Sequence, residues 1–189
     1  MLAYIFWHYP REETNVATYE SHLTALHEGL RNAAMGEFRG SRSFRVAGLP
    51  WINSASKAYE DWYLLDGWAV LDGLNAAAVG GERKAPHDRA AAAAAGGAGG
   101  IYRLRAGADA MMGDTSAQWF SKPEGMPYAA LDDILRPLLR TGCALWQRQM
   151  VLGPGLEFCL IGPEPVTFPD SINAIAVKRF KIQPSTQTP

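Results

Sequence analysis

Residues 59–79 read YEDWYLLDGWAVLDGLNAAAV, and the pattern of this stretch decides the fold that we expect. Up to Leu65 the stretch is a short run of aromatic and apolar residues, which favours a buried strand over a helix. An Asp-Gly pair at 66–67 is typical of a tight turn. Apolar residues then return at helical spacing, at Trp68, Leu71, Leu74 and Ala78. The stretch therefore predicts a strand, a turn and a helix in direct succession.

The sequence on both sides of this stretch predicts three more strands and one more helix. Residues 2–9 are apolar at odd and at even positions, which is typical of a strand covered on both faces. Asn15 can cap a helix over 16–34, and a strand follows over 41–49. A strand over 101–105 completes the order strand, helix, strand, strand, helix, strand. This is the ferredoxin-like order.

A stretch rich in alanine and glycine, residues 85–100, precedes the last of these strands. Its alanines predict a short helix, and the glycines at 96–100 predict a flexible turn. The glycines do not fit the spacing Gly-x-Gly-x-x-Gly, and they precede a strand instead of opening a helix. We therefore do not expect a dinucleotide-binding loop.

The second half of the chain repeats the plan of the first in a shorter form. The sequence WFSKP at 119–123 parallels FWHYP at 6–10, and a helix is predicted over 127–140 with a kink at Pro137. Residues 148–154 echo the second strand of the first half, and further strands are predicted over 156–161 and 174–182. The residues between these two strands show little helical pattern, so we expect the second helix of the repeat to be reduced or lost. We divide the chain into a first repeat at 1–107, a linker at 108–115 and a second, shortened repeat at 116–189.

The two halves are expected to bury one another. A four-stranded sheet with helices on one face leaves its other face bare, and the strands at 62–65 and 156–161 look apolar on both faces. Two such sheets that face each other would solve this problem.

This organisation resembles the dimeric alpha-beta barrel superfamily, in a fused version where one chain supplies both sheets, and residues 61–74 are its clearest local part. The resemblance implies an α+β fold of two tandem ferredoxin-like repeats, with antiparallel sheets packed into a barrel-like pseudo-dimer. The superfamily includes cofactor-free monooxygenases, muconolactone-type isomerases, haem-binding chlorite dismutases and stress-responsive barrels. It therefore implies a small-molecule cavity more than any single reaction.

The composition argues against several classes of protein. The 189 residues include 18 Lys and Arg and 19 Asp and Glu without a basic stripe, so we expect neither nucleic acid nor a membrane as partner. Cys143 and Cys159 lack Cys-x-x-Cys spacing and lie in apolar surroundings, which suits reduced thiols in a cytoplasmic protein. The first residues read as a strand and not as a signal peptide, and no apolar run approaches the roughly 20 residues that span a bilayer. We expect a monomer or a homodimer with a small-molecule ligand.

The histidines are the first candidates for chemistry, and all of them lie in the first half, at positions 8, 22, 27 and 87. On the helix over 16–34, His27 falls near the apolar stripe and can face the sheet, whereas His22 falls at the rim. His8 ends the first strand, where cavity mouths occur in this architecture, so we choose it as the catalytic candidate. The alternative for each is a structural histidine with satisfied hydrogen bonds.

Neighbouring strands supply a second polar cluster. Arg42 and Arg45 lie on the second strand, with Asp61 and Tyr63 on the next one. In this cluster Arg45 can hold an anionic substrate, with Tyr63 or His8 as proton donor. An ion pair at the sheet edge is the alternative. We predict catalytic roles for His8 and Tyr63, and ligand binding by His27, Arg45, Asp61 and Trp62. We predict no metal site and no cofactor.

These patterns favour a small-molecule-binding protein, with a cofactor-independent monooxygenase or isomerase as its enzymatic form. The first alternative is a non-catalytic interaction or scaffold protein whose barrel core is filled by large aromatic side chains. The second is a haem protein. The chlorite dismutases that this layout resembles bind haem through a histidine of the second half, and here the second half contains none.

Overall fold

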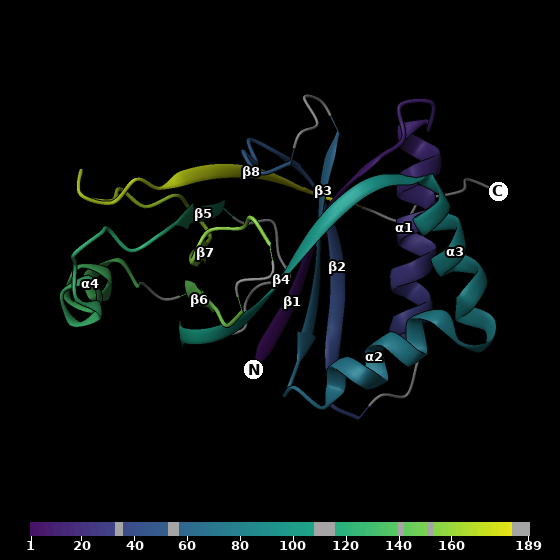
Figure 1. The fold of residues 1–189 in the computed structure, drawn as a ribbon, viewed down its shortest axis with the longest axis horizontal. Helices are drawn as coiled ribbons and strands as arrows, with labels where there is room; N and C mark the ends of the chain where they lie inside the picture. Colours follow the sequence, from purple (N-terminus) through teal and green to yellow (C-terminus); the bar gives the residue numbers. More distant parts are fainter. Residues whose placement is uncertain (33–35, 53–56, 108–115, 140–141, 151–152, 183–189) are drawn as a thin grey trace.

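Eight antiparallel strands form one closed barrel in the order β1-β3-β2-β8-β5-β7-β6-β4 (Figure 1). This computed structural model describes residues 1–32, 36–52, 57–107, 116–139, 142–150 and 153–182. The strands are β1 (Leu2–Pro10), β2 (Phe38–Ala47), β3 (Ala58–Leu65), β4 (Ala94–Gly107), β5 (Ser116–Phe120), β6 (Ala144–Arg148), β7 (Phe158–Gly162) and β8 (Ile175–Lys181). The helices are α1 (Val16–Arg31), α2 (Val70–Val79), α3 (Lys84–Ala93) and α4 (Tyr128–Leu135), with 3-10 turns at Gly81–Arg83 and Arg136–Leu138.

The strands of each half lie in the same relative order. Going round the barrel, β4-β1-β3-β2 is followed by β8-β5-β7-β6, so in each half the fourth strand lies beside the first. The two halves join by hydrogen bonds, β2 to β8 and β4 to β6. The sequence predicted two sheets packed face to face, whereas the structure closes them edge to edge into one sheet. Closure pairs the outer strands of both halves, which would otherwise be exposed edges.

Aromatic side chains fill the barrel interior. Four tryptophans are fully buried there: Trp7, Trp62, Trp119 and Trp146. Glu60 lies among them and accepts hydrogen bonds from the indole N–H of Trp7 (2.9 Å) and of Trp62 (2.5 Å). Arg179 brings its Nε to 3.3 Å from the same carboxylate, so this buried negative charge is paired.

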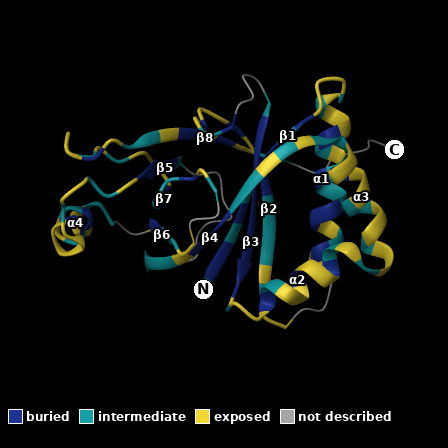
Figure 2. Ribbon diagram, viewed as in Figure 1, coloured by how far each residue is buried: buried dark blue, intermediate teal, exposed yellow. Residues whose placement is uncertain are grey.

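Three helices of the first half cover the outer face of β1, β3 and β4 (Figures 1 and 2). The Asn15 side chain accepts the backbone N–H of Ala17 at 2.8 Å and caps α1, as the sequence predicted. The helix ends at Arg31, and the predicted last residue, Ala34, lies outside the described part of the chain. The buried side of α1 carries Tyr19, Leu23, Leu26, His27 and Leu30.

The second half is covered more sparsely. Helix α4 packs Leu131 and Leu135 on the outer face of β5 and β7, and a 3-10 turn begins at Arg136, next to Pro137. The described residues between β7 and β8 contain no helix, which confirms that the second helix of this half is lost. Strand β6 ends at Arg148, the first residue of the stretch 148–154 that echoes the end of the second strand, and residues 151 and 152 of that stretch lie outside the described part of the chain.

The glycine-rich residues 96–100 also correct a prediction. They are not a turn but part of β4, whose residues 94–103 pair with β1. A Cβ atom on Gly97 would lie 2.6 Å from the Phe6 ring and 2.7 Å from the carbonyl oxygen of Trp7, and one on Gly99 would lie 2.8 Å from the Tyr4 ring. Because these glycines have no side chains, the aromatic rings of β1 can pack directly against β4.

We predict that Gly97→Ala lowers the free energy of unfolding by about 1–3 kcal/mol, because the new methyl group has no room between a ring and a backbone carbonyl. Urea unfolding measures this change. Gly73→Ala in α2 is the control, since a Cβ there meets nothing within 4 Å and should raise stability by about 0.5–1 kcal/mol. Unchanged stability of Gly97→Ala would mean that β4 does not need glycine at this position.

Candidate functional site

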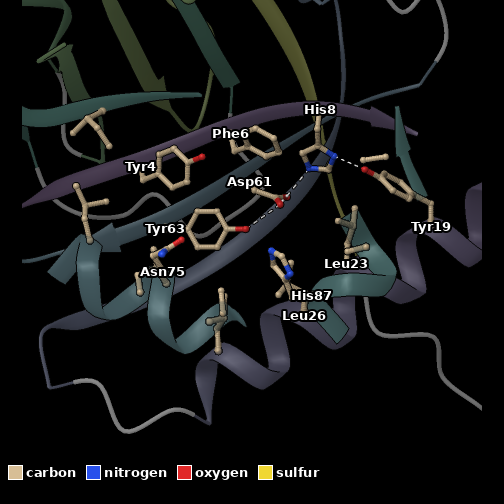
Figure 3. A pocket seen from close by; sticks show the side chains of 17 residues that line it. Tyr4, Phe6, His8, Tyr19, Leu23, Leu26, Asp61, Tyr63, Asn75 and His87 are labelled. Atoms are coloured by element: carbon tan, nitrogen blue, oxygen red, sulfur yellow. Dashed lines mark hydrogen bonds and ion pairs between the residues drawn. The ribbon is translucent and has the colours of Figure 1, made fainter. Parts of the chain in front are cut away.

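A cavity of about 430 Å³ lies between the outer face of the first-half sheet and helices α1, α2 and α3 (Figure 3). It lies outside the barrel, so the side chains that fill the barrel core do not occupy it. Most of its wall is apolar or aromatic, and polar groups line it both from the sheet and from each of the three helices. The lining residues are Tyr4, Phe6, His8, Tyr19, Leu23, Leu26, Leu30, Asp61, Tyr63, Leu71, Leu74, Asn75, Ala78, His87, Ala90, Ala94 and Ile101.

A buried carboxylate between two histidines forms the polar end of this cavity. Asp61 Oδ2 lies 3.2 Å from His8 Nε2, and Asp61 Oδ1 lies 3.4 Å from His27 Nε2. The three residues come from β3, β1 and α1, and each is less than 10% exposed. These contacts have ion-pair distances without the alignment of full hydrogen bonds. The two histidines therefore hold Asp61 from opposite sides of one carboxylate.

Three hydroxyl groups complete the network. Tyr19 Oη lies 2.6 Å from His8 Nδ1, and Ser41 Oγ lies 2.7 Å from His27 Nδ1. Tyr63 donates its O–H to Asp61 Oδ2 at 3.2 Å. If the first two hydroxyls donate to the Nδ1 atoms, both histidines carry their proton on Nε2, toward the carboxylate. We assign these tautomers from the hydrogen-bond pattern.

Burial and this network shift the acid–base properties of the site in opposite directions. Burial alone would raise the pKa of Asp61, but the charges of His8 and His27 and their close contacts with its oxygens outweigh it and hold the pKa well below its usual range. Burial, followed by the Asp61 charge, raises the pKa of Tyr63 and of Tyr19 well above that of a free phenol. Both phenols are therefore protonated at neutral pH and can donate hydrogen bonds.

The structure brings four of the predicted site residues together: His8, His27, Asp61 and Tyr63. It does not bring Trp62 and Arg45 to this cavity. Trp62 alternates with Asp61 along β3 and so faces the barrel interior. Arg45 lies on the exposed side of β2, with its Nη1 3.5 Å from Glu20 Oε1 and its guanidinium over the Phe180 ring.

Several lining residues were not predicted from the sequence. Tyr19 lies on the apolar stripe of α1, and its helical spacing relative to His27 was a usable signal. Asn75 and His87 come from α2 and α3, and no sequence pattern marked them. The His87 ring projects into the cavity, with its Nδ1 3.2 Å from Asp88 Oδ1 (Figure 3). Within the described part of the chain, His87 Nε2 has no hydrogen-bond partner.

His8 and His27 do not suit ligation of haem or of another metal. Both ring nitrogens of His8 and of His27 face protein groups, so ligation would break a contact with Asp61, Tyr19 or Ser41. Across the described residues, no three His, Cys, Asp or Glu side chains converge as a metal ligand set. We therefore derive no step through haem or a metal ion.

No family model and no curated protein matches the sequence. Solved structures do match the fold. A proposed monooxygenase from Lactobacillus acidophilus NCFM has a TM-score of 0.57 at 6% identity, over 94% of this chain and 93% of that chain. A proposed chlorite dismutase has a TM-score of 0.54 at 9% identity, over 97% and 95%. An anthrone oxidase-like protein has a TM-score of 0.53 at 9% identity, over 100% and 96%.

The fold is that of the dimeric alpha-beta barrel proteins. At these identities the likeness concerns the fold alone, and function must be argued from the site. No helix within the described ranges is long and apolar enough to cross a membrane.

We predict that Asp61→Asn lowers the free energy of unfolding by about 3 kcal/mol, because an amide N–H₂ would face a histidine N–H and a buried network would lose its charge. The lowered pKa of Asp61 also sets a pH dependence. Its stabilisation is present above the unfolded pKa of about 4 and is lost as the pH falls toward the folded pKa. Urea unfolding between pH 2 and pH 7 should show a smaller acid loss for Asp61→Asn than for the wild type.

Asp133→Asn is the matched control. Asp133 lies on an exposed part of α4, where its ion pair with Arg136 is open to solvent. We expect this variant to change stability by less than about 0.5 kcal/mol. If Asp61→Asn were as stable as Asp133→Asn at every pH, the two histidines would not depend on the carboxylate.

Proposed function

We propose that the protein binds a small, partly aromatic organic molecule in the cavity under α1, α2 and α3, and that it acts there as a cofactor-independent monooxygenase. One observation carries this proposal. A mostly apolar cavity ends at a buried network of an aspartate, two histidines and two tyrosines. Convergent polar groups at the end of an apolar cavity are typical of a small-molecule site.

The network supplies acid–base chemistry. His8, oriented by Asp61, takes the hydroxyl proton of Tyr19 as Tyr19 takes a proton from the ligand, so that His8 is the final proton acceptor. Tyr63 stays protonated, and its O–H turns from Asp61 Oδ2 to donate a hydrogen bond to the oxyanion that forms on the ligand. His27 holds Asp61 from the other side and keeps its charge in place.

The fold neighbours support oxidation by O₂ as the reaction, since a proposed monooxygenase and an anthrone oxidase-like protein share the fold. A ligand with an acidic CH₂ group beside an aromatic carbonyl would lose a proton to the network and become an electron-rich anion. O₂ then oxidises that carbon from CH₂ to C=O. One oxygen atom stays on the carbon and the other leaves as water, so the reaction needs no separate reductant. Isomerisation by proton transfer would use the same residues without O₂.

The alternative of a non-catalytic scaffold protein rests on the barrel interior. This interior is filled by buried side chains, four tryptophans among them. The cavity under the helices favours ligand binding over this alternative. We further propose that residues 1–107 and 116–189 are tandem repeats, of which the first keeps the site. The matching strand order of the two halves and the three helices over the first support this division.

Native mass spectrometry of the purified chain tests the binding half of this proposal. We expect added mass that is lost on denaturation, or added mass after incubation with anthrone, a compact aromatic ketone with an acidic CH₂ group. The variant Leu26→Trp fills the cavity from α1 and should abolish the added mass. Equal retention by Leu26→Trp would mean that the compound binds elsewhere.

Oxygen uptake with anthrone, corrected for the uncatalysed reaction, tests the oxidase half. We predict that His8→Gln lowers kcat/KM by about 10²-fold, because the proton acceptor is lost. His22→Gln is the matched control, since His22 lies on α1 but does not line the cavity. If His8→Gln unfolded at a lower temperature and still oxidised anthrone at the wild-type rate, His8 would be structural.

A further inference from the structure

His87 faces the cavity from the helix side, and the acid–base network described above does not include it. The residue lies on α3, and its ring points into the cavity from the wall opposite Asp61 and Tyr63 of β3 (Figure 3). The next residue of α3 that lines the cavity is Ala90, three positions later on the same side of the helix. Alanine has no side-chain atom beyond its Cβ. Helix α3 therefore leaves space beside the imidazole ring for a bound molecule.

Two charged residues of α3 set the proton position on this ring. His87 Nδ1 lies 3.2 Å from Asp88 Oδ1, and Asp88 Oδ2 pairs with Lys84 Nζ one helical turn earlier. The hydrogen bond from Lys84, followed by that from His87, lowers the pKa of Asp88, so this carboxylate is ionised at neutral pH. An ionised carboxylate only accepts hydrogen bonds, so the proton of the neutral ring lies on Nδ1. Nε2 then carries a lone pair and is a hydrogen-bond acceptor.

The acceptors at the sheet side of the cavity are already engaged. His8 directs Nδ1 to Tyr19 and Nε2 to Asp61, and the Asp61 carboxylate contacts both histidines and the Tyr63 hydroxyl. By contrast, His87 Nε2 has neither a hydrogen bond nor an ion pair among the described residues. An unpaired acceptor in a mostly apolar cavity favours a ligand that brings a hydrogen-bond donor to it.

We propose that His87 Nε2 accepts a hydrogen bond from a hydroxyl group of the ligand, so that the cavity selects hydroxylated aromatic compounds. The hydroxyl then lies on the edge of the ligand that faces α3, away from the oxyanion that Tyr63 binds. A site that is built to accept an O–H group rejects the analogue without it, because the acceptor is left unpaired. The proposal rests on the proposed binding of an aromatic molecule in this cavity, but not on its oxidation.

Calorimetry of the full chain with 2-naphthol and with 2-methoxynaphthalene at pH 7 tests this role. The two compounds share one ring system, and only 2-naphthol has an O–H donor. Neither has an acidic CH₂ group, so the measurement does not depend on the oxidase reaction. We expect 2-naphthol to bind roughly fivefold more tightly, as for one hydrogen bond between neutral groups. The NMR signal of His87 Nε2 should shift with 2-naphthol and stay in place with the methoxy compound.

Three variants assign the preference to a residue. His87→Phe keeps an aromatic ring but removes the acceptor, so we expect the two compounds to bind with equal affinity. His87→Gln keeps an amide oxygen as acceptor and should retain part of the preference. Asn75→Leu is the matched control, because Asn75 is a polar residue that lines the same cavity from α2. We expect its ratio of the two affinities to stay within about twofold of the wild-type ratio.

Each contrary outcome has a distinct meaning. A preference for 2-naphthol that survives His87→Phe would overturn the role of His87, and equal affinity of the wild type for both compounds would overturn it as well. In both cases the cavity would still bind aromatic molecules, so the proposed function would stand. A wild-type chain that bound neither compound would contradict the cavity as a site for aromatic ligands and overturn both proposals.

Discussion

The structure depends on a strand that is buried on both faces. Every residue of β3 is buried, and its side chains alternate between two environments. Glu60 and Trp62 point into the barrel, whereas Asp61 and Tyr63 point toward the helices. A shift of one residue in the register would exchange these sets and place an aspartate among the tryptophans. The pairing of β3 with β1 and β2 thus fixes the barrel core and the candidate site together.

Each face of β3 neutralises one buried acid in its own way. Inside the barrel, Glu60 receives two indole N–H groups and the charge of Arg179. Outside it, Asp61 receives two histidines and a phenol. The first arrangement is sealed by aromatic rings and has no access to a ligand. The second opens into a cavity, which is why we assign chemistry to Asp61 and structure to Glu60.

Glycine-rich β4 and the helices set the space around the site. Its glycines leave room for the rings of Tyr4 and Phe6, which form part of the cavity wall. Helix α1 adds Tyr19, Leu23, Leu26 and Leu30 to the same wall, and its His27 contacts Asp61 on the carboxylate oxygen that His8 does not reach.

The sequence by itself determined the local elements. The apolar runs at 2–9 and 59–65, the helical spacing in 16–34 and the cap at Asn15 all depend on near neighbours in the chain, so their patterns are visible in one dimension. It also marked His8, His27, Asp61 and Tyr63. The tertiary structure alone decided that β2 joins β8 and that the site lies outside the barrel. It brought His87 and Asn75 to the cavity and left Arg45 and Trp62 away from it, because these outcomes depend on strand register and on helices packed from distant parts of the chain.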